Sequence, residues 1–258
     1  MEPGMDTQRL ILLVGFVGSG KTTYARELWK TAPHRLVRVS MDDLIQMLSF
    51  YDYQRHLVDL YRRQERSTVI HALARGLDVV VDRTNLDRKT RQVFLDIGRT
   101  FRRLGARALE LLRAQGLFGH PHPSEIRRAL VHLVQPLEDR EAFATALSEA
   151  IDTLAHGGGT SLFPWSSEPI TLESYFERLR TLRLEAVWLR VPPEICLERR
   201  LSDPLLPLRE QVRTVDWQAV LDNMQRQFEP PSLREGFDEI RILDAEFRLQ
   251  EIRNPSAP

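Results

Sequence analysis

Residues 9–22 read Arg9-Leu-Ile-Leu-Leu-Val-Gly15-Phe-Val-Gly-Ser-Gly20-Lys21-Thr22, a short apolar run followed by a glycine-rich segment. A continuous apolar run is typical of a strand that is covered on both faces of a parallel sheet. The glycine-rich segment fits the pattern G-x-x-x-x-G-K-[ST], in which glycines let backbone N–H groups curl around a phosphate. A helical pattern follows from about residue 21 to 30, so its N-terminal N–H groups and positive dipole end would face the same anion.

This loop predicts a nucleoside triphosphate ligand together with Mg²⁺. Lys21 would reach the β- and γ-phosphates, and the Thr22 hydroxyl would bind Mg²⁺. The residues that we expect to hold the nucleotide are Gly15, Gly18, Ser19, Gly20, Lys21, Thr22 and Thr23. An ordinary turn into a helix is the alternative, but the strand before the loop and the helix after it favour a nucleotide site.

Strands and helices alternate along much of the chain. Further strands are predicted at 35–40, 77–82, 185–191 and 237–243, with helices at about 53–75, 87–104, 171–182, around Arg199 and at 208–228. Such alternation predicts parallel strands joined by right-handed crossovers. We therefore expect an α/β fold, the three-layer sandwich of P-loop NTPases, with a mostly parallel sheet, flanking helices and a mainly helical insertion.

The alternation breaks between residues 113 and 170. A helical pattern from about Ser124 to Ala155 is interrupted at Pro136, and a loop follows at about 156–170. We interpret residues 113–170 as an insertion within a single domain that spans residues 1–258, and residues 246–258 as a flexible C-terminal tail.

The composition excludes several classes of protein. With 258 residues, of which 42% are hydrophobic, the chain can build a core, so a fully disordered protein is excluded. Since 36 basic residues balance 36 acidic ones, the bulk charge indicates neither a nucleic-acid nor a membrane partner. The single cysteine, Cys196, permits no disulfide within the chain and no Cys-based zinc site, which suits a cytoplasmic protein. No run approaches the roughly 20 apolar residues of a membrane span, so no membrane segment is expected.

Acidic residues follow two of the predicted strands, in residues 40–43 (Ser-Met-Asp-Asp) and 82–85 (Asp-Arg-Thr-Asn). In an open parallel sheet, ligands bind at the carboxyl ends of the strands. A carboxylate there can deprotonate an attacking hydroxyl or hold Mg²⁺. We predict that Asp42 is the base and that Asp82 is a metal ligand beside Thr22. The alternatives are a helix N-cap for Asp42 or Asp43, and simple turn residues for Thr84 and Asn85.

Arg199 and Arg200 lie on the helix that leaves the predicted strand at 185–191. Arginines in this place can stabilise the charge that develops on a transferred phosphoryl group, so we predict both as catalytic residues. Arg209 and Arg213 are further candidates, which would complete a lid. A solvated basic helix end is the alternative for either Arg199 or Arg200.

These pieces, in this order, resemble the P-loop kinases of the polynucleotide 5′-hydroxyl kinase type, a phage-type family related to the zeta toxins. The residues that carry the resemblance are Gly15-x4-Gly-Lys-Thr22, Ser40-Met-Asp-Asp43, Asp82-x-Thr-Asn85, Val187 to Arg200, and Glu235-Gly-Phe-Asp-Glu-Ile240. The resemblance covers most of residues 9–104 and 184–245. It implies a P-loop kinase domain, ATP and Mg²⁺, in-line transfer of the γ-phosphoryl group, and Asp42 as the base. Ile45 stands where the phage member has an arginine that helps to hold the substrate phosphate.

Weaker candidates lie outside these motifs. Two arginine clusters could follow the phosphates of an oligonucleotide or form solvated helix faces: Arg62, Arg63 and Arg66, and Arg99, Arg102, Arg103 and Arg107. Three aromatic residues could stack on bases or form a small core: Phe163, Trp165 and Tyr175. His120 and His122 have a metal-like spacing but no acidic or cysteine partner nearby.

Three functions are consistent with these features. The first is an ATP-dependent kinase with a hydroxyl acceptor, preferably the 5′-OH of a polynucleotide. The second is a kinase of a small-molecule hydroxyl, such as a sugar, nucleoside or nucleotide-sugar, which the neutral net charge and Ile45 favour. The third is a nucleotide-gated binding module without kinase activity, with the insertion as its partner surface. The expected partners are thus a nucleoside triphosphate and, in the first case, a nucleic-acid 5′ end.

Overall fold

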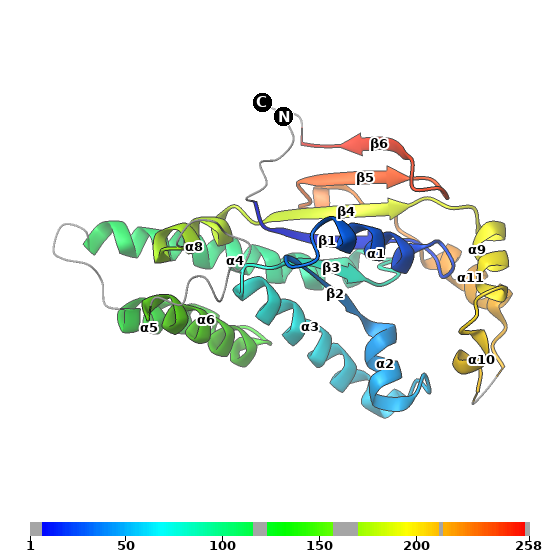
Figure 1. The fold of residues 1–258 in the computed structure, drawn as a ribbon, viewed down its shortest axis with the longest axis horizontal. Coiled ribbons are helices and arrows are strands. Elements are labelled where there is room, and N and C mark those ends of the chain that lie inside the picture. Colours follow the sequence, from blue (N-terminus) through cyan, green and yellow to red (C-terminus); the bar gives the residue numbers. More distant parts are fainter. Residues whose placement is uncertain (1–6, 116–122, 157–169, 212–213, 256–258) are drawn as a thin grey trace.

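The computed structural model describes residues 7–115, 123–156, 170–211 and 214–255. Six strands form one sheet in the order β2-β3-β1-β4-β5-β6. All neighbouring strands are parallel except β5 and β6, which are antiparallel. Helices cover both faces of this sheet (Figure 1). The predicted α/β sandwich with a mostly parallel sheet is therefore confirmed.

The strands are short and their centre is apolar. They are β1 (Arg9–Val14), β2 (Leu36–Ser40), β3 (Asp78–Asp82), β4 (Arg183–Leu189), β5 (Glu239–Leu243) and β6 (Leu249–Arg253). All of β3 is buried, as is β1 after its first residue, because helices cover both faces. The strand predicted at 185–191 begins two residues earlier, since Arg183 pairs with Arg9 of β1.

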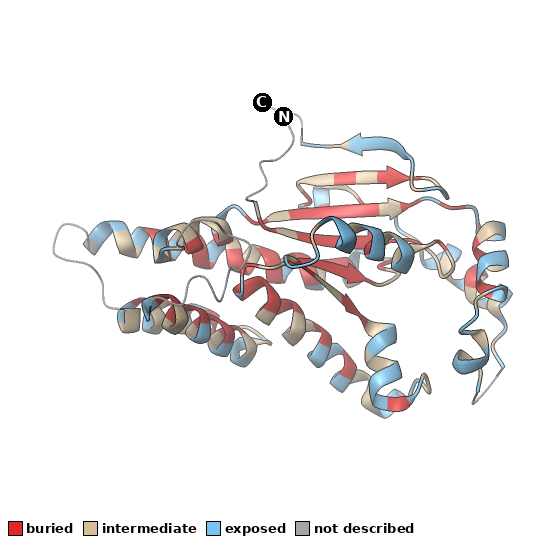
Figure 2. Cartoon of the chain, viewed as in Figure 1, coloured by how far each residue is buried: buried red, intermediate tan, exposed pale blue. Residues whose placement is uncertain are grey.

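The helices form two layers. On one face of the sheet lie α3 (Val58–Ala74) and α4 (Arg88–Gln115). Three further helices pack against these two and share their apolar core: α5 (Pro123–Val134), α6 (Arg140–Ala155) and α8 (Leu172–Arg180). The other face is covered by α1 (Lys21–Thr31), α9 (Pro193–Leu201) and α11 (Trp217–Gln227). Buried residues follow the helix sides that face the sheet (Figure 2). Within the described residues, no helix combines the length and the apolar character needed to span a bilayer.

Two helices lie at the end of the sheet where the parallel strands terminate (Figure 1): α2 (Met41–Ser49) and α10 (Leu206–Arg209). The short 3-10 helices η1 (Arg55–Leu57) and η2 (Leu233–Glu235) complete the described helical elements. α2 is not among the helices expected from apolar periodicity, because nine residues give little periodic signal, although a helix N-cap at Asp42 or Asp43 was one alternative. One helix was expected at 208–228, where the chain instead forms α10 and then α11. The side chain of Asp216 starts α11 by accepting a hydrogen bond from the Ala219 N–H at 2.9 Å.

The helices of the predicted insertion lie at the opposite end of the sheet from α2 and α10 (Figure 1). α5 ends at Val134 and α6 begins at Arg140, so the predicted interruption at Pro136 is present. Their buried side chains belong to the same apolar core as those of α3, α4 and α8. α4 also runs past its predicted end at residue 104, because Ala108 and Leu109 continue its buried face.

The C-terminal segment differs from the prediction. Residues 246–258 were expected to form a flexible tail, but Leu249–Arg253 forms β6, which pairs with β5. Ile240 and Arg253 mark one end of this pairing, which also contains a register irregularity next to Leu243. The strand was missed because most of its residues are exposed at the edge of the sheet, so it lacks a clear apolar pattern.

A buried ion pair fixes the start of α4. Arg91 is fully buried, and its guanidinium donates two hydrogen bonds of 2.8 Å to the carboxylate of Glu235 in η2. Its remaining nitrogen, Nη1, donates to the carbonyl oxygens of Asn85, Leu86 and Glu229. The pair therefore ties the segment after β3 to the segment before β5.

We predict that Glu235→Ala lowers the free energy of unfolding by about 3–5 kcal/mol, because it leaves the Arg91 charge buried without its partner. The matched control is Glu110→Ala, which removes an exposed partner of Arg107 and should cost less than about 1 kcal/mol. Urea unfolding of both variants measures the difference. Equal losses would contradict the role assigned to the buried pair.

Candidate active site

The phosphate loop between β1 and α1 is held in shape by its neighbours. Gly15, Gly18 and Gly20 all have φ between 75° and 154°, which side chains rarely adopt. The Gly15 N–H donates to the Thr84 carbonyl at 3.0 Å. A Cβ on Gly18 would lie 2.0 Å from the carbonyl oxygen of Cys196 in α9, so only glycine fits there. Cys196 itself is buried, and burial raises the pKa of its thiol to about 11.

Lys21 begins α1 and folds back over the loop. Its Nζ donates to the Phe16 carbonyl at 2.5 Å and to Ser19 Oγ at 3.3 Å. Burial lowers the pKa of Lys21 from 10.5 to about 8, although the nearby carboxylates of Asp82 and Asp42 oppose the shift. The ammonium group thus lies at the phosphate loop, bonded to a carbonyl and a hydroxyl oxygen. Its positive charge there would favour a bound anion.

Asp82 closes β3 and contacts the loop directly. Its Oδ2 accepts hydrogen bonds from Thr22 Oγ1 at 2.8 Å and from Arg38 Nε at 2.7 Å. Thr22 and Asp82 therefore place two oxygen donors side by side, which suits Mg²⁺, an ion that commonly keeps waters and takes further ligands from substrate phosphates. No cluster of three or more His, Cys, Asp or Glu side chains able to hold a metal occurs within the described residues.

Asp42 lies in the first turn of α2, across the cleft from α9 and α10. The N-cap of α2 is Ser40, whose Oγ accepts from the Asp43 N–H at 3.4 Å, so neither acidic residue is the cap. Asp43 instead pairs with Arg38 of β2. The half-exposed carboxylate of Asp42 accepts a hydrogen bond of 3.0 Å from Arg209 Nη1.

The arginines after β4 occupy different positions. Arg200 is buried, donates to Asp203 Oδ2 at 3.0 Å, and lies 4.3 Å from the centre of the Trp217 ring. Arg199 is exposed and donates to the Ala245 carbonyl at 3.0 Å. Burial, followed by the nearby Arg209 charge, lowers the pKa of Arg200. The buried position of Arg200 is inconsistent with a solvated helix end.

These groups line one cleft of about 700 Å³. The predicted site residues on its surface are Gly18, Gly20, Lys21, Thr22, Thr23, Asp42, Asp82, Arg199 and Arg200. Gly15 and Ser19 lie behind this surface as parts of the loop backbone, and Ser19 is fully buried. Arg209 also lines the cleft, whereas Arg213 lies outside the described residues.

Sequence reasoning assigned no role to Arg83 and Asp203, which line this cleft, or to Arg38, which contacts the cleft residue Asp82. Arg38 also contacts Asp43, and Asp203 contacts both Arg200 and Arg209. Arg38 and Asp203 stand in no motif, and the partner of Arg83, which lies within the 82–85 motif, comes from another element. Thr84 lines the cleft, while Asn85 is buried and donates from Nδ2 to the Leu13 carbonyl at 2.8 Å.

The weaker candidates lie elsewhere. Tyr175 is buried and donates its hydroxyl proton to the Ala74 carbonyl at 2.8 Å, so it belongs to the core. In the two arginine clusters, the side chains with intramolecular partners are Arg66, Arg99, Arg102, Arg103 and Arg107. The predicted positions at His120, His122, Phe163 and Trp165 lie outside the described residues.

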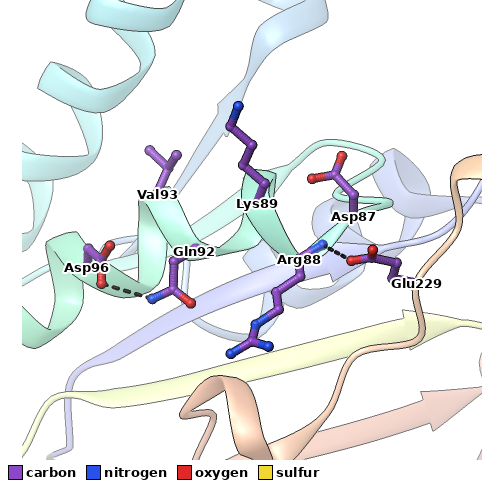
Figure 3. A pocket seen from close by; sticks show the side chains of 7 residues that line it. All are labelled: Asp87, Arg88, Lys89, Gln92, Val93, Asp96 and Glu229. Atoms are coloured by element: carbon purple, nitrogen blue, oxygen red, sulfur yellow. Dashed lines mark hydrogen bonds between the residues drawn. The ribbon is translucent and has the colours of Figure 1, made fainter.

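A second hollow, of about 550 Å³, lies beside the start of α4 (Figure 3). Its lining residues are Asp87, Arg88, Lys89, Gln92, Val93, Asp96 and Glu229. Here the Asp87 carboxylate accepts from the Thr90 N–H at 2.7 Å, and the Glu229 carboxylate accepts from the Arg88 N–H at 2.7 Å. Both acidic groups are thus occupied by the helix start, and none of the predicted site residues in the described part lines this hollow.

Comparisons with known proteins add to this geometry. Among solved structures, a chain of the Pnkp1/Rnl/Hen1 complex is 26% identical over 38% of this chain, with a TM-score of 0.33. This chain covers only 33% of that one. A chain of the PezAT toxin–antitoxin system of Streptococcus pneumoniae is 13% identical, with coverages of 99% and 77% and a TM-score of 0.42. Deoxyadenosine kinase from M. mycoides is 15% identical, with coverages of 93% and 92% and a TM-score of 0.39.

These TM-scores lie below 0.5, so the likenesses do not identify an acceptor. No curated protein matches the chain. Residues 10–113, which contain the phosphate loop, Asp42 and Asp82, match the family model described as an AAA domain. The resemblance predicted from the sequence agrees with this match: residues 10–113, less than half of the chain, are similar to the family described as an AAA domain.

Proposed function

We propose that this protein is an ATP-dependent kinase that transfers the γ-phosphoryl group of ATP to a hydroxyl acceptor. The observation that carries the proposal is the convergence of three groups on one cleft of about 700 Å³. Lys21 comes from the phosphate loop, Asp82 from the end of β3, and Asp42 from the start of α2. A phosphate cradle, a metal-side carboxylate and a second carboxylate facing them are the parts that phosphoryl transfer requires.

In this mechanism the loop backbone and Lys21 bind the triphosphate, and Thr22 and Asp82 hold Mg²⁺. The metal, when bound, supplies charge neutralisation at the phosphate oxygens. Arg38 donates to Asp82 and so fixes the carboxylate beside Thr22. Arg200, held by Asp203, lies on the far wall of the cleft, where its charge can stabilise the transferred group.

Asp42 acts as the base. The acceptor hydroxyl oxygen attacks the γ-phosphorus, the bond from phosphorus to the β–γ bridging oxygen breaks, and ADP leaves. The hydroxyl proton passes to the Asp42 carboxylate. Because Arg209 donates to the same carboxylate, the acceptor must compete with this ion pair to reach Asp42. Once displaced, the Arg209 charge is available to the phosphates.

For the acceptor, we propose the 5′-OH of a polynucleotide. The cleft supports this choice because its lining contains more cationic than acidic side chains, which suits an acceptor with phosphates of its own. A small hydroxyl compound is the second candidate. It is favoured by the bridge that α10 makes across the cleft, where Arg209 contacts Asp42 and the Gln211 side chain donates to the Phe50 carbonyl. A bridged cleft suits a compact acceptor.

Asp42→Asn tests the base. The substitution keeps the size of the side chain but removes its capacity to take a proton, so transfer should fall by about 10²–10⁴-fold. The Kd for ATP should stay nearly unchanged, because Asp42 does not belong to the phosphate loop. Calorimetry and acceptor-dependent ADP release measure the two quantities. Full turnover in the variant would exclude Asp42 as the base.

The acceptor can be identified by incubating the protein and labelled ATP with 5′-OH oligonucleotides or with a panel of sugars, nucleosides and nucleotide-sugars. We expect label transfer to the oligonucleotides and faster ADP release in their presence. Transfer only to small compounds would favour the second candidate. ATP binding without acceptor-dependent ADP release from any compound would contradict the kinase proposal and support a binding module instead.

The lowered pKa of Lys21 predicts a pH dependence of nucleotide binding. Above pH 8 the free protein loses the Lys21 proton, whereas a bound triphosphate favours the charged form, so binding must take up a proton. The affinity for ATP should therefore fall between about pH 8 and 10, by at most about tenfold per pH unit. Lys21→Arg stays charged and should show a flatter profile by calorimetry. Equal slopes in both proteins would contradict the assignment.

A further inference from the structure

α3 carries a buried carboxylate in an otherwise apolar row. Tyr61, Glu65 and Val69 lie four residues apart along one side of α3, and all three are buried. Glu65 Oε2 accepts a hydrogen bond of 2.8 Å from Arg83 Nη1, while Glu65 Oε1 is buried without a hydrogen-bond partner among the described residues. Burial raises the pKa of Glu65, and the Arg83 charge opposes this shift.

Such a pair is a poor way to stabilise a fold. Removing two charges from water costs more than their attraction commonly returns, and apolar side chains of similar volume often serve better. The half-satisfied carboxylate of Glu65 makes the arrangement less favourable still. The pair is therefore better explained by its effect on Arg83, the partner that reaches the cleft.

Arg83 follows Asp82 at the end of β3, the strand between β1, which leads into the phosphate loop, and β2, which leads to Asp42. Asp82 contacts the loop through Thr22, whereas Arg83 is drawn to the α3 side by Glu65. The Arg83 side chain is one-quarter exposed and lines the same cleft. It thus stands on the wall opposite the α9 and α10 arginines.

The charges in the cleft do not balance. Its cationic lining residues are Lys21, Arg26, Arg83, Arg199, Arg200 and Arg209, and its acidic ones are Asp42, Asp82 and Asp203. Arg200 and Arg209 are paired with acids that line the cleft, but the partner of Arg83 lies behind the wall. A guanidinium has five N–H donors, and Arg83 uses one of them within the described residues. Its remaining donors suit an anionic ligand group.

We propose that Glu65 is a positioning residue that holds Arg83 in the cleft, and that Arg83 binds a phosphate group of the acceptor, near the hydroxyl that is phosphorylated. This inference rests on the proposed kinase function and extends it to the acceptor class. A guanidinium donates to phosphate with directional, charge-assisted hydrogen bonds. Held from behind by a buried carboxylate, it loses less conformational freedom when the acceptor binds.

Two thymidine dinucleotides with a free 5′-OH test the proposal. One has the natural phosphodiester linkage and the other a methylphosphonate linkage, which has nearly the same shape but no charge. The native protein should bind the charged form about 10–100-fold more tightly, the range expected for one charge-assisted contact. Arg83→Gln should reduce this preference to near one, and Arg83→Lys should restore part of it. In turnover, the loss should fall on KM for the dinucleotide rather than on kcat.

Glu65→Gln should give an intermediate preference, because Arg83 remains but is held less firmly. The matched control is Arg88→Gln, which changes an exposed arginine that does not line the cleft. Its side chain lies at the second hollow instead (Figure 3). This variant should keep the native preference. The melting temperature of each variant shows whether the fold is retained, and if Glu65→Gln unfolds, the Arg83 variants still decide the matter.

Native discrimination in Arg83→Gln would overturn the proposal, as would weak and equal binding of both dinucleotides to the native protein. Native discrimination in a folded Glu65→Gln variant would overturn the positioning role. If the native protein prefers the charged dinucleotide, loses that preference in Arg83→Gln, and yet transfers no phosphoryl group, the anion site stands and the kinase proposal fails. The binding arm thus separates the two claims.

Discussion

The site depends on the close approach of two backbone segments to the phosphate loop. At Gly18 the carbonyl of Cys196 leaves no space for a side chain, and at Gly15 the N–H is bound by the Thr84 carbonyl. The loop is therefore clamped between the start of α9 and the end of β3. Loop amides that are fixed before a ligand arrives lose little freedom on binding an anion, which is why a cradle of this kind can hold a triphosphate.

The two carboxylates of the cleft are held in different ways. Asp82 is bound by Thr22 and Arg38, which belong to α1 and β2, so its position is set by the sheet itself. Asp42 is bound by Arg209, which belongs to α10 on the other side of the cleft. A group that serves a metal needs a constant position, whereas a base must be reached by the acceptor. The difference in their partners agrees with the roles proposed for Asp82 and Asp42.

Local features of the chain were predictable, and long-range pairings were not. The structure of residues 9–22 could be predicted from local sequence alone, since an apolar run, glycines and a lysine suffice to predict a strand, a loop and the start of a helix. The carboxyl ends of parallel strands also bring Asp42 and Asp82 to one edge without further information. The contacts of Glu65 and Arg38 could not be predicted in this way, because their partners lie on other elements. β6 was missed for a related reason: an exposed edge strand gains its stability from β5 and not from an apolar pattern.

The neutral net charge of the chain bears on the acceptor only if the charges are spread evenly, and within the described residues they are not. Many peripheral arginines are neutralised by nearby acids, as in the pairs Arg107–Glu110, Arg127–Asp152 and Arg180–Glu177. The cleft keeps a surplus of cations, because the carboxylate that pairs with Arg83 lies behind its wall. Within a cleft, such a local surplus acts on a ligand more strongly than the same charges would on an open surface. The net charge of the chain is therefore a poor guide to the ligand. The position of each arginine relative to its acidic partner is more informative.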